Sequence, residues 1–145
     1  MLPEFYRFRV YNGSGQTLTY ADAARVEVHI TPWKMTSGAM AQGTIISDTT
    51  SLLNTGETIT ATSSVEGDVH DNTTLLHIGF TGTFYVKADS SSTDGPITLW
   101  MEMSTDNSRW PSDMSDGLSS PPTELILLGT IDISEDEDKM VNIQF

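Results

Sequence analysis

The feature that most constrains the fold of this chain is an alternation of apolar and polar residues with a period of two. In the stretch 5–12, Tyr6 and Phe8 fall on one face, whereas Arg7 and Arg9 fall on the other. This period matches a β-strand, in which successive side chains point to opposite faces of a sheet. No window of eleven residues carries the spacing of an amphipathic helix. The chain is therefore predicted to be all-β, with little or no helix.

About nine short strands are expected from this pattern. Their predicted ranges are residues 5–12, 25–30, 44–47, 58–62, 75–80, 83–88, 97–104, 127–133 and 140–145. The connections are rich in Gly, Ser, Thr and Asn, which favours an antiparallel β-sandwich or a jelly roll. No repeat or linker interrupts the pattern, so residues 1–145 are predicted to form a single β-sandwich domain.

Two irregular stretches and the two terminal strands are candidates for contacts with other subunits. Pro32 is expected to end a strand, so that residues 32–43 and 105–123 form loops. Tryptophan, methionine and arginine are enriched in protein interfaces. Terminal strands often lie at a sheet edge, where an unpaired strand attracts a second chain. The predicted interface residues are Trp110, Arg109, Pro111, Trp33, Met35, Phe5, Tyr11 and Phe145. The alternative for each loop tryptophan is that it closes the end of its own sandwich.

The net charge and the cysteine content limit which classes of partner the protein is expected to bind and in which cellular compartment it is expected to assemble. Seven Lys and Arg stand against 20 Asp and Glu, which gives a formal net charge of −13. This charge repels phosphate backbones and anionic lipid, so neither nucleic acid nor membrane is an expected partner. The chain has no cysteine, and its first residues lack the basic start of a secretory signal. We therefore expect assembly in the cytoplasm.

No residue set indicates catalysis. His29, His70 and His77 share no metal-binding motif, and there is no thiolate to assist them. The sequence also lacks a Gly-x-Ser-x-Gly elbow and a phosphate-binding loop. The protein is therefore expected not to be an enzyme and to need no cofactor.

Calcium is the one metal that the acidic loops suggest, because it prefers carboxylate and carbonyl oxygens. The weak candidates are Asp68, Asp71, Asp89 and Asp94. None of them has the spacing of an EF-hand loop. The favoured alternative is that each lies in a solvated turn between strands.

Residues 82–87 (Gly-Thr-Phe-Tyr-Val-Lys) and 97–111 form a recognisable pair of segments. The second is an apolar strand that ends in Glu-x-Ser-x-Asp and is followed by Asn107 and Trp110. Asn107 stands where glycine is usual, and asparagine tolerates the left-handed geometry of such a turn. The last four residues, Asn-Ile-Gln-Phe, are similar in style. Together these segments resemble structural proteins of tailed bacteriophages.

The resemblance implies a virion protein, most similar to head decoration or cement proteins. Such a protein would bind the major capsid protein or other virion subunits and would assemble with itself as a homo-oligomer. The alternative within the class is a tail-tube or head–tail connector subunit. A second alternative is a carbohydrate-binding module that stacks a sugar on Trp33, Trp100 or Trp110.

Overall fold

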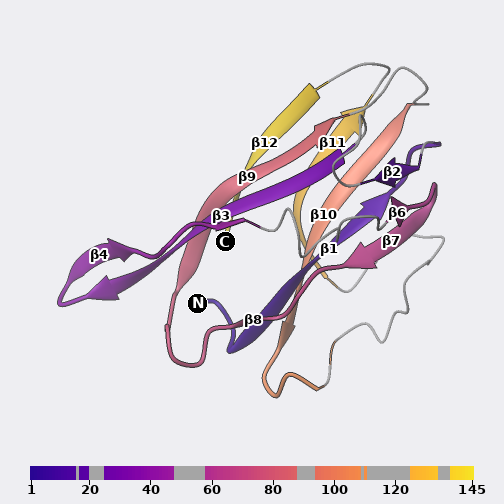
Figure 1. Cartoon of the computed structure of the whole chain (residues 1–145). Coiled ribbons are helices and arrows are strands. Elements are labelled where there is room, and N and C mark those ends of the chain that lie inside the picture. Colours follow the sequence, from indigo (N-terminus) through magenta and orange to yellow (C-terminus); the bar gives the residue numbers. More distant parts are fainter. Residues whose placement is uncertain are drawn as a thin grey trace.

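The computed structural model (Figure 1) describes residues 1–15, 17–19, 25–47, 58–87, 94–108, 110, 125–133 and 138–145. Every regular element in these ranges is a strand, and none is a helix. The strands are β1 (Phe5–Asn12), β2 (Leu18–Thr19), β3 (Arg25–Thr36), β4 (Ala39–Gln42), β5 (Ile46–Ser47), β6 (Thr58–Ile59), β7 (Ser63–Glu66), β8 (His70–Asp71), β9 (Gly79–Lys87), β10 (Gly95–Ser104), β11 (Ile126–Ile133) and β12 (Asp138–Gln144). The all-β prediction is confirmed. In the described ranges, no helix long and apolar enough to cross a membrane occurs.

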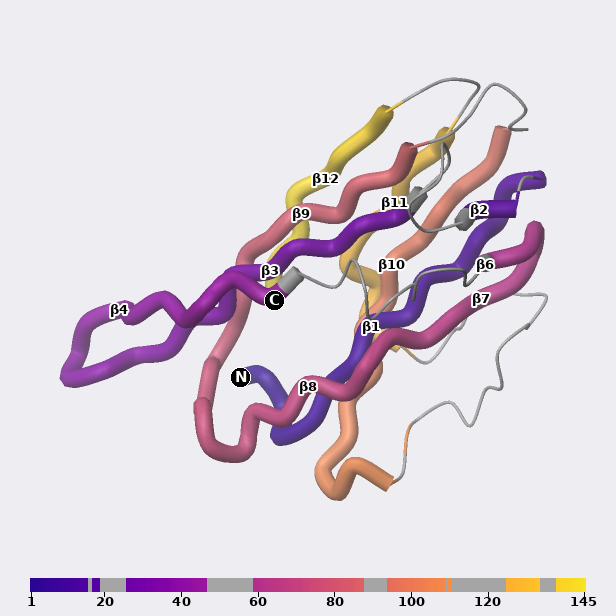
Figure 2. The backbone as a smooth tube through the Cα atoms, in the orientation of Figure 1, coloured from indigo at the N-terminus to yellow at the C-terminus, as the bar shows by residue number. Residues whose placement is uncertain are grey.

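The strands form two antiparallel sheets that pack against each other. The first sheet has the order β11-β10-β1-β7, with β8 also paired to β1, and the second has the order β12-β9-β3-β4, with β5 also paired to β3. Strands β2 and β6 form a separate pair. Figure 2 shows the strands of both sheets, and β11 of the first sheet contacts β12 of the second. The predicted β-sandwich is confirmed.

The core lies between the sheets and consists of the apolar positions that the alternation assigns to one face. From the first sheet, Phe8 is fully buried, and its ring meets that of Phe80 from the second sheet edge-on, with centroids 5.8 Å apart. The other fully or almost fully buried side chains are Tyr6, Val10, Leu18, Val26, Val28, Ile30, Ile59, Phe84, Val86, Ile97, Leu99, Met101, Ile131 and Ile133. The inward faces are therefore those that the period of two predicts.

Several predicted strand boundaries are wrong, among them those at Pro32 and at residue 75. Pro32 does not end a strand, because β3 continues through it to Thr36. Its position explains the tolerance. The Pro32 carbonyl accepts from the Gly43 amide (2.7 Å), so the Pro32 nitrogen lies on the side of β3 that faces β4 and β5. On that side β5 pairs with β3 only up to Ile30 and β4 only from Trp33 onward, so the missing N–H removes no ladder hydrogen bond. The strand expected at residues 75–80 begins only at Gly79, and residues 72–78 form a connection between β8 and β9.

The expectation that a terminal strand lies at a sheet edge is correct for β12 and wrong for β1. Strand β12 pairs with β9, and the described residues place no strand on its other side. Strand β1 instead lies inside its sheet, with β10 on one side and β7 and β8 on the other. Its backbone groups are occupied on both sides, so β1 offers no free edge for a second subunit.

Candidate functional site

A hairpin projects from the sandwich and forms its most exposed strand pair. Residues 33–42, which we call the arm, comprise the end of β3 and all of β4, and Met35 and Met40 are cross-strand partners in it. The turn consists of Ser37 and Gly38, both with positive φ (52° and 81°), as a two-residue hairpin requires. Figure 1 shows the arm reaching well beyond both sheets. The segment predicted as an irregular loop is therefore a regular, extended structure.

The arm carries apolar side chains into solvent. Met35 and Met40 are 53% and 65% exposed. The pairing of β3 with β9 ends at Trp33 and Gly79. Beyond this point β3 pairs only with β4, and both methionines lie in that part. At the base, Trp33 is half-buried and its ring lies over Gly79, where a Cβ would come within 2.7 Å of it. A rigid base with an apolar, flexible tip is the arrangement expected of a contact surface.

A second group of exposed apolar side chains lies at the same end of the molecule, on the N-terminus and the β8–β9 connection (Figure 1). Met1, Leu75 and Leu76 are exposed, and the Lys34 ammonium of the arm donates a hydrogen bond to the carbonyl oxygen of Leu75 (3.1 Å). We call Met1, Leu75, Leu76 and the hollow that they border the end surface. With Ile45, the arm and the end surface hold six of the nine large apolar side chains that are exposed among the described residues.

Asn72 fixes the shape of the end surface. Its side-chain oxygen accepts a hydrogen bond from the His77 amide (2.8 Å), and its side-chain nitrogen donates to the His77 and Pro3 carbonyls (3.0 and 3.2 Å). The amide of Leu76 donates to the Asn72 carbonyl (3.0 Å), which places Leu76 in the left-handed region with φ 53°. This conformation costs a residue with a Cβ about 1–2 kcal/mol. The loop therefore holds an apolar side chain in solvent, 69% exposed, at some conformational cost.

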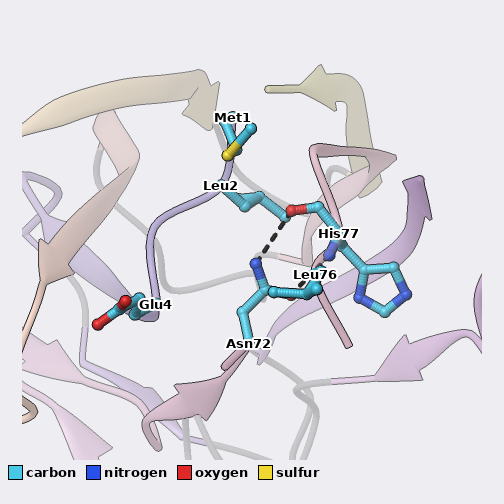
Figure 3. A pocket seen from close by; sticks show the side chains of 6 residues that line it. All are labelled: Met1, Leu2, Glu4, Asn72, Leu76 and His77. Carbon is cyan, nitrogen blue, oxygen red and sulfur yellow. Dashed lines mark hydrogen bonds between the residues drawn. The ribbon is translucent and has the colours of Figure 1, made fainter. Parts of the chain in front are cut away.

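The hollow beside Leu76 has a volume of about 280 Å³. Figure 3 shows the residues that line it, with the hydrogen bonds between Asn72 and His77 as dashed lines. They are Met1, Leu2, Glu4, Asn72, Leu76 and His77. A second hollow of about 330 Å³ lies on the other side of His77, between Leu75 and the base of the arm. Mostly apolar, shallow hollows of this size accept side chains of a partner better than they enclose a substrate.

His77 separates the two hollows and is itself buried. Its ring packs on Gly43, where a Cβ would come within 2.7 Å of Nε2. Burial lowers the pKa of His77 below its usual 6.5, and the Lys34 ammonium lowers this pKa further. The neutral imidazole is therefore part of the folded end surface.

Acidification is expected to weaken the fold through His77. Because the pKa is lower in the folded than in the unfolded state, the unfolded state takes up the proton first, and the stabilisation is present above about pH 6.5 and lost as the pH falls through the folded pKa. The free energy of unfolding, measured by urea titration at about pH 7.5 and pH 5, should fall more for the wild type than for His77→Gln. Equal losses in both proteins would show that His77 is not the responsible group.

The outward face of the first sheet holds a cluster of four charged side chains, two of which, Arg7 and Arg9, the alternation placed on the face opposite Tyr6 and Phe8. Arg9 and Glu102 are fully buried, with Arg9 Nε 2.6 Å from Glu102 Oε1. Glu102 Oε2 also accepts from Arg7 (2.7 Å), and Glu66 Oε2 lies within 2.8 Å of both guanidinium groups. The strand register brings these residues together, since Arg9 faces Glu66 on β7 and Arg7 faces Glu102 on β10. The cluster is internally neutralised, which favours a role in holding three strands together.

The remaining predicted interface residues divide between this face and the second sheet. Trp110 is half-buried, and the Arg7 guanidinium lies over its ring at 4.4 Å, so it packs on its own domain. Tyr11 is buried, and Phe5 is half-buried beside β8 and β10. Phe145 stacks on Phe80 with centroids 6.1 Å apart. Arg109 and Pro111 lie outside the described residues.

The three tryptophans of the sugar-binding alternative do not all lie together. Trp33 belongs to the second sheet, whereas Trp100 belongs to the first, opposite Arg9. The indole N–H of Trp100 donates to the Thr98 hydroxyl (2.7 Å), and the Arg7 guanidinium lies over the ring of Trp110. Trp33 and Trp100 are therefore on different sheets of the sandwich.

The calcium candidates that the structure describes, Asp68, Asp71 and Asp94, do not form a metal site with one another. In the described part of the chain, no group of three or more His, Asp or Glu side chains is placed to hold a metal ion. The Asp71 carboxylate accepts hydrogen bonds from the Thr73 hydroxyl (2.6 Å) and amide (2.8 Å), which lower the pKa of Asp71. Asp68 and Asp94 are exposed, and Asp89 lies outside the described residues. Asp71, the last residue of β8, thus stabilises the turn that follows this strand.

Two functional features were not predicted from the sequence. The end surface depends on Leu75 and Leu76, which the alternation placed in a strand, and the ionic cluster depends on partners up to 95 positions apart. One available signal was the pair Arg7 and Arg9, which places two of only seven basic residues on a single strand face. The other was the adjacent pair of leucines directly after Asn-Thr-Thr, a turn-forming segment.

Comparison with known proteins adds no relative. Neither a family model, nor a curated protein, nor a solved structure matches this chain. Its function is therefore inferred from its own residues and geometry.

Proposed function

We propose that this protein is a non-enzymatic structural subunit of a tailed-phage particle, which acts by binding its neighbours through the arm and the end surface. The observation that carries the proposal is the arm, a hairpin that leaves the sandwich and presents Met35 and Met40 to solvent. A monomer gains nothing in stability from such an element, because an isolated two-stranded hairpin is marginally stable in water. An apolar extension of this kind is stabilised when a second subunit covers it.

Within that class we propose a capsid decoration protein, which binds the major capsid protein on the outer head surface as a homo-oligomer. The formal charge of −13 supports an external position, because a strongly acidic chain is repelled by packaged DNA. The resemblance of residues 82–87 and 97–111 to phage structural proteins supports the same class. Assembly in the host cytoplasm and residence in the virion follow from this assignment.

A tail-tube or connector subunit is the second candidate, and one observation favours it. The arm and the end surface are different surfaces of one subunit. If the arm of one copy binds the end surface of the next, the contact joins unlike surfaces, and such contacts generate rings or open filaments. A ring-forming subunit uses such contacts around a tube, whereas a decoration protein needs them only within its small oligomer.

The test is the protein content of particles purified from cells that carry the gene. Heads and tails are separated after disruption, and quantitative mass spectrometry measures the copies of this protein in each fraction. Head-associated protein in proportion to the capsid lattice supports decoration, and tail-associated protein supports the second candidate. Its absence from purified particles would contradict a virion role altogether.

A further inference from the structure

We infer that the arm of one copy binds the end surface of a second copy, with Met35 and Met40 packed against Leu76 and into the hollow beside it. This inference rests on the proposed assembly function and specifies its contact. The hollow has a volume of about 280 Å³ and a largely apolar lining. Methionine is unbranched and flexible, so it fills irregular apolar hollows without a preformed shape.

The geometry excludes the same copy as the occupant. Lys34, at the base of the arm, touches the Leu75 carbonyl, but the tip with Met35 and Met40 extends away from the end surface (Figure 1). The loop that carries Leu76 is held by the hydrogen bonds of Asn72, so it does not fold over the arm. The tip of one copy therefore meets an end surface only on another copy.

Charge identifies a second copy as a suitable partner. The chain carries 20 acidic residues, yet none lies between Glu27 and Asp48 or between Asp71 and Asp89. These two acid-free segments contain the arm and the Leu75–Leu76 loop. Elsewhere, two copies with a formal charge of −13 each repel one another. Approach of two like copies through these two segments therefore meets less charge repulsion than approach through the acidic parts of the chain.

The contact is between unlike surfaces, so each copy offers one arm and one end surface. Such a contact does not stop at a dimer but continues to a ring or an open chain. Tip-to-tip pairing of two arms is the opposing arrangement, and it would stop at a dimer. A mixing experiment separates the two arrangements.

The experiment uses the whole chain with Met40→Glu, which damages the arm, and Leu76→Asp, which damages the end surface. Both side chains are exposed, and aspartate tolerates the left-handed backbone at position 76 better than leucine, so both variants are expected to fold. Leu127→Glu, at an exposed position on β11, adds the same charge elsewhere and serves as the control. Circular dichroism checks the fold, and sedimentation velocity measures the assembly.

Met40→Glu and Leu76→Asp are each expected to weaken self-association about thirtyfold or more, as loss of an interface anchor does, whereas Leu127→Glu is not. An equimolar mixture of the two defective variants should form a heterodimer, since one supplies an intact arm and the other an intact end surface. The inference is overturned if Leu76→Asp assembles like the wild type, if the mixture stays monomeric, or if the wild type never self-associates. The particle content described above is independent of these results and tests the proposed function separately.

Discussion

Glu102→Ala is expected to lower the free energy of unfolding by about 3–5 kcal/mol, because it leaves Arg9 charged and buried without its main partner. Both side chains are fully buried, and their 2.6 Å contact has no access to water. For a chain of 145 residues, this loss corresponds to a fall in melting temperature of about 10–15 °C. Thermal unfolding followed by circular dichroism measures it.

Glu66→Ala is the matched comparison. Glu66 contacts the same two guanidinium groups, but its side chain is 33% exposed, so water replaces much of the lost interaction. We expect its effect to be less than half that of Glu102→Ala. Equal effects of the two substitutions, or an effect of Glu102→Ala below about 1 kcal/mol, would show that the cluster does not hold the first sheet together.

Deletion of residues 140–145 is expected to abolish folding, and not only assembly. The segment supplies most of β12, which pairs with β9, and it includes the buried Ile143 and the stacked Phe145. Each large apolar side chain removed from the core costs about 1.5–3 kcal/mol, so losing these together with Val141 approaches the total stability of a typical domain, about 5–15 kcal/mol.

The truncated chain should therefore lack a cooperative thermal transition and expose apolar surface to a fluorescent dye. A cooperative transition within a few degrees of the wild type would contradict the assigned role of β12. Because folding fails first, this deletion does not report on subunit contacts. Met140→Ser removes an exposed side chain of β12 without that loss and is the better probe of its free edge.

The fold was predictable because its core follows a local rule, and the candidate site was not because it depends on distant residues. Alternation at Tyr6, Phe8 and Val10 correctly gave the inward face of β1. The same rule assigned Arg9 to solvent, since only the register of three strands brings Glu66 and Glu102 beside it. Sequence propensity likewise placed a strand end at Pro32, whereas the offset of β4 and β5 permits the strand to continue.

The predicted interface residues also show what can be predicted from the sequence and what depends on the folded structure. Trp33 and Met35 were predicted from composition alone as contact residues, and they lie on the arm. That prediction stays untested, but its structural setting is now defined. Trp110 was predicted on the same grounds, and the Arg7 guanidinium of its own domain lies over its ring, while its contact with a partner stays untested. The types of residue in a loop therefore do not show whether the loop contacts a partner or its own domain. The three-dimensional structure of the loop is needed to decide this.

The most direct test of the arm as the assembly surface is the incorporation of variant protein into particles. Met35→Ser/Met40→Ser removes the apolar tip, and Met140→Ser removes a methionine of similar exposure, 62% against 65% for Met40, from the edge of β12. In the cells that produce the particles, each variant gene replaces the wild-type gene. Mass spectrometry then measures the number of copies of the variant protein per purified particle. The expected result is at least a tenfold loss for the arm variant, with an unchanged melting temperature, and normal incorporation of Met140→Ser. Normal incorporation of the arm variant would contradict the account, and a defect in Met140→Ser alone would assign assembly to the edge of β12 instead.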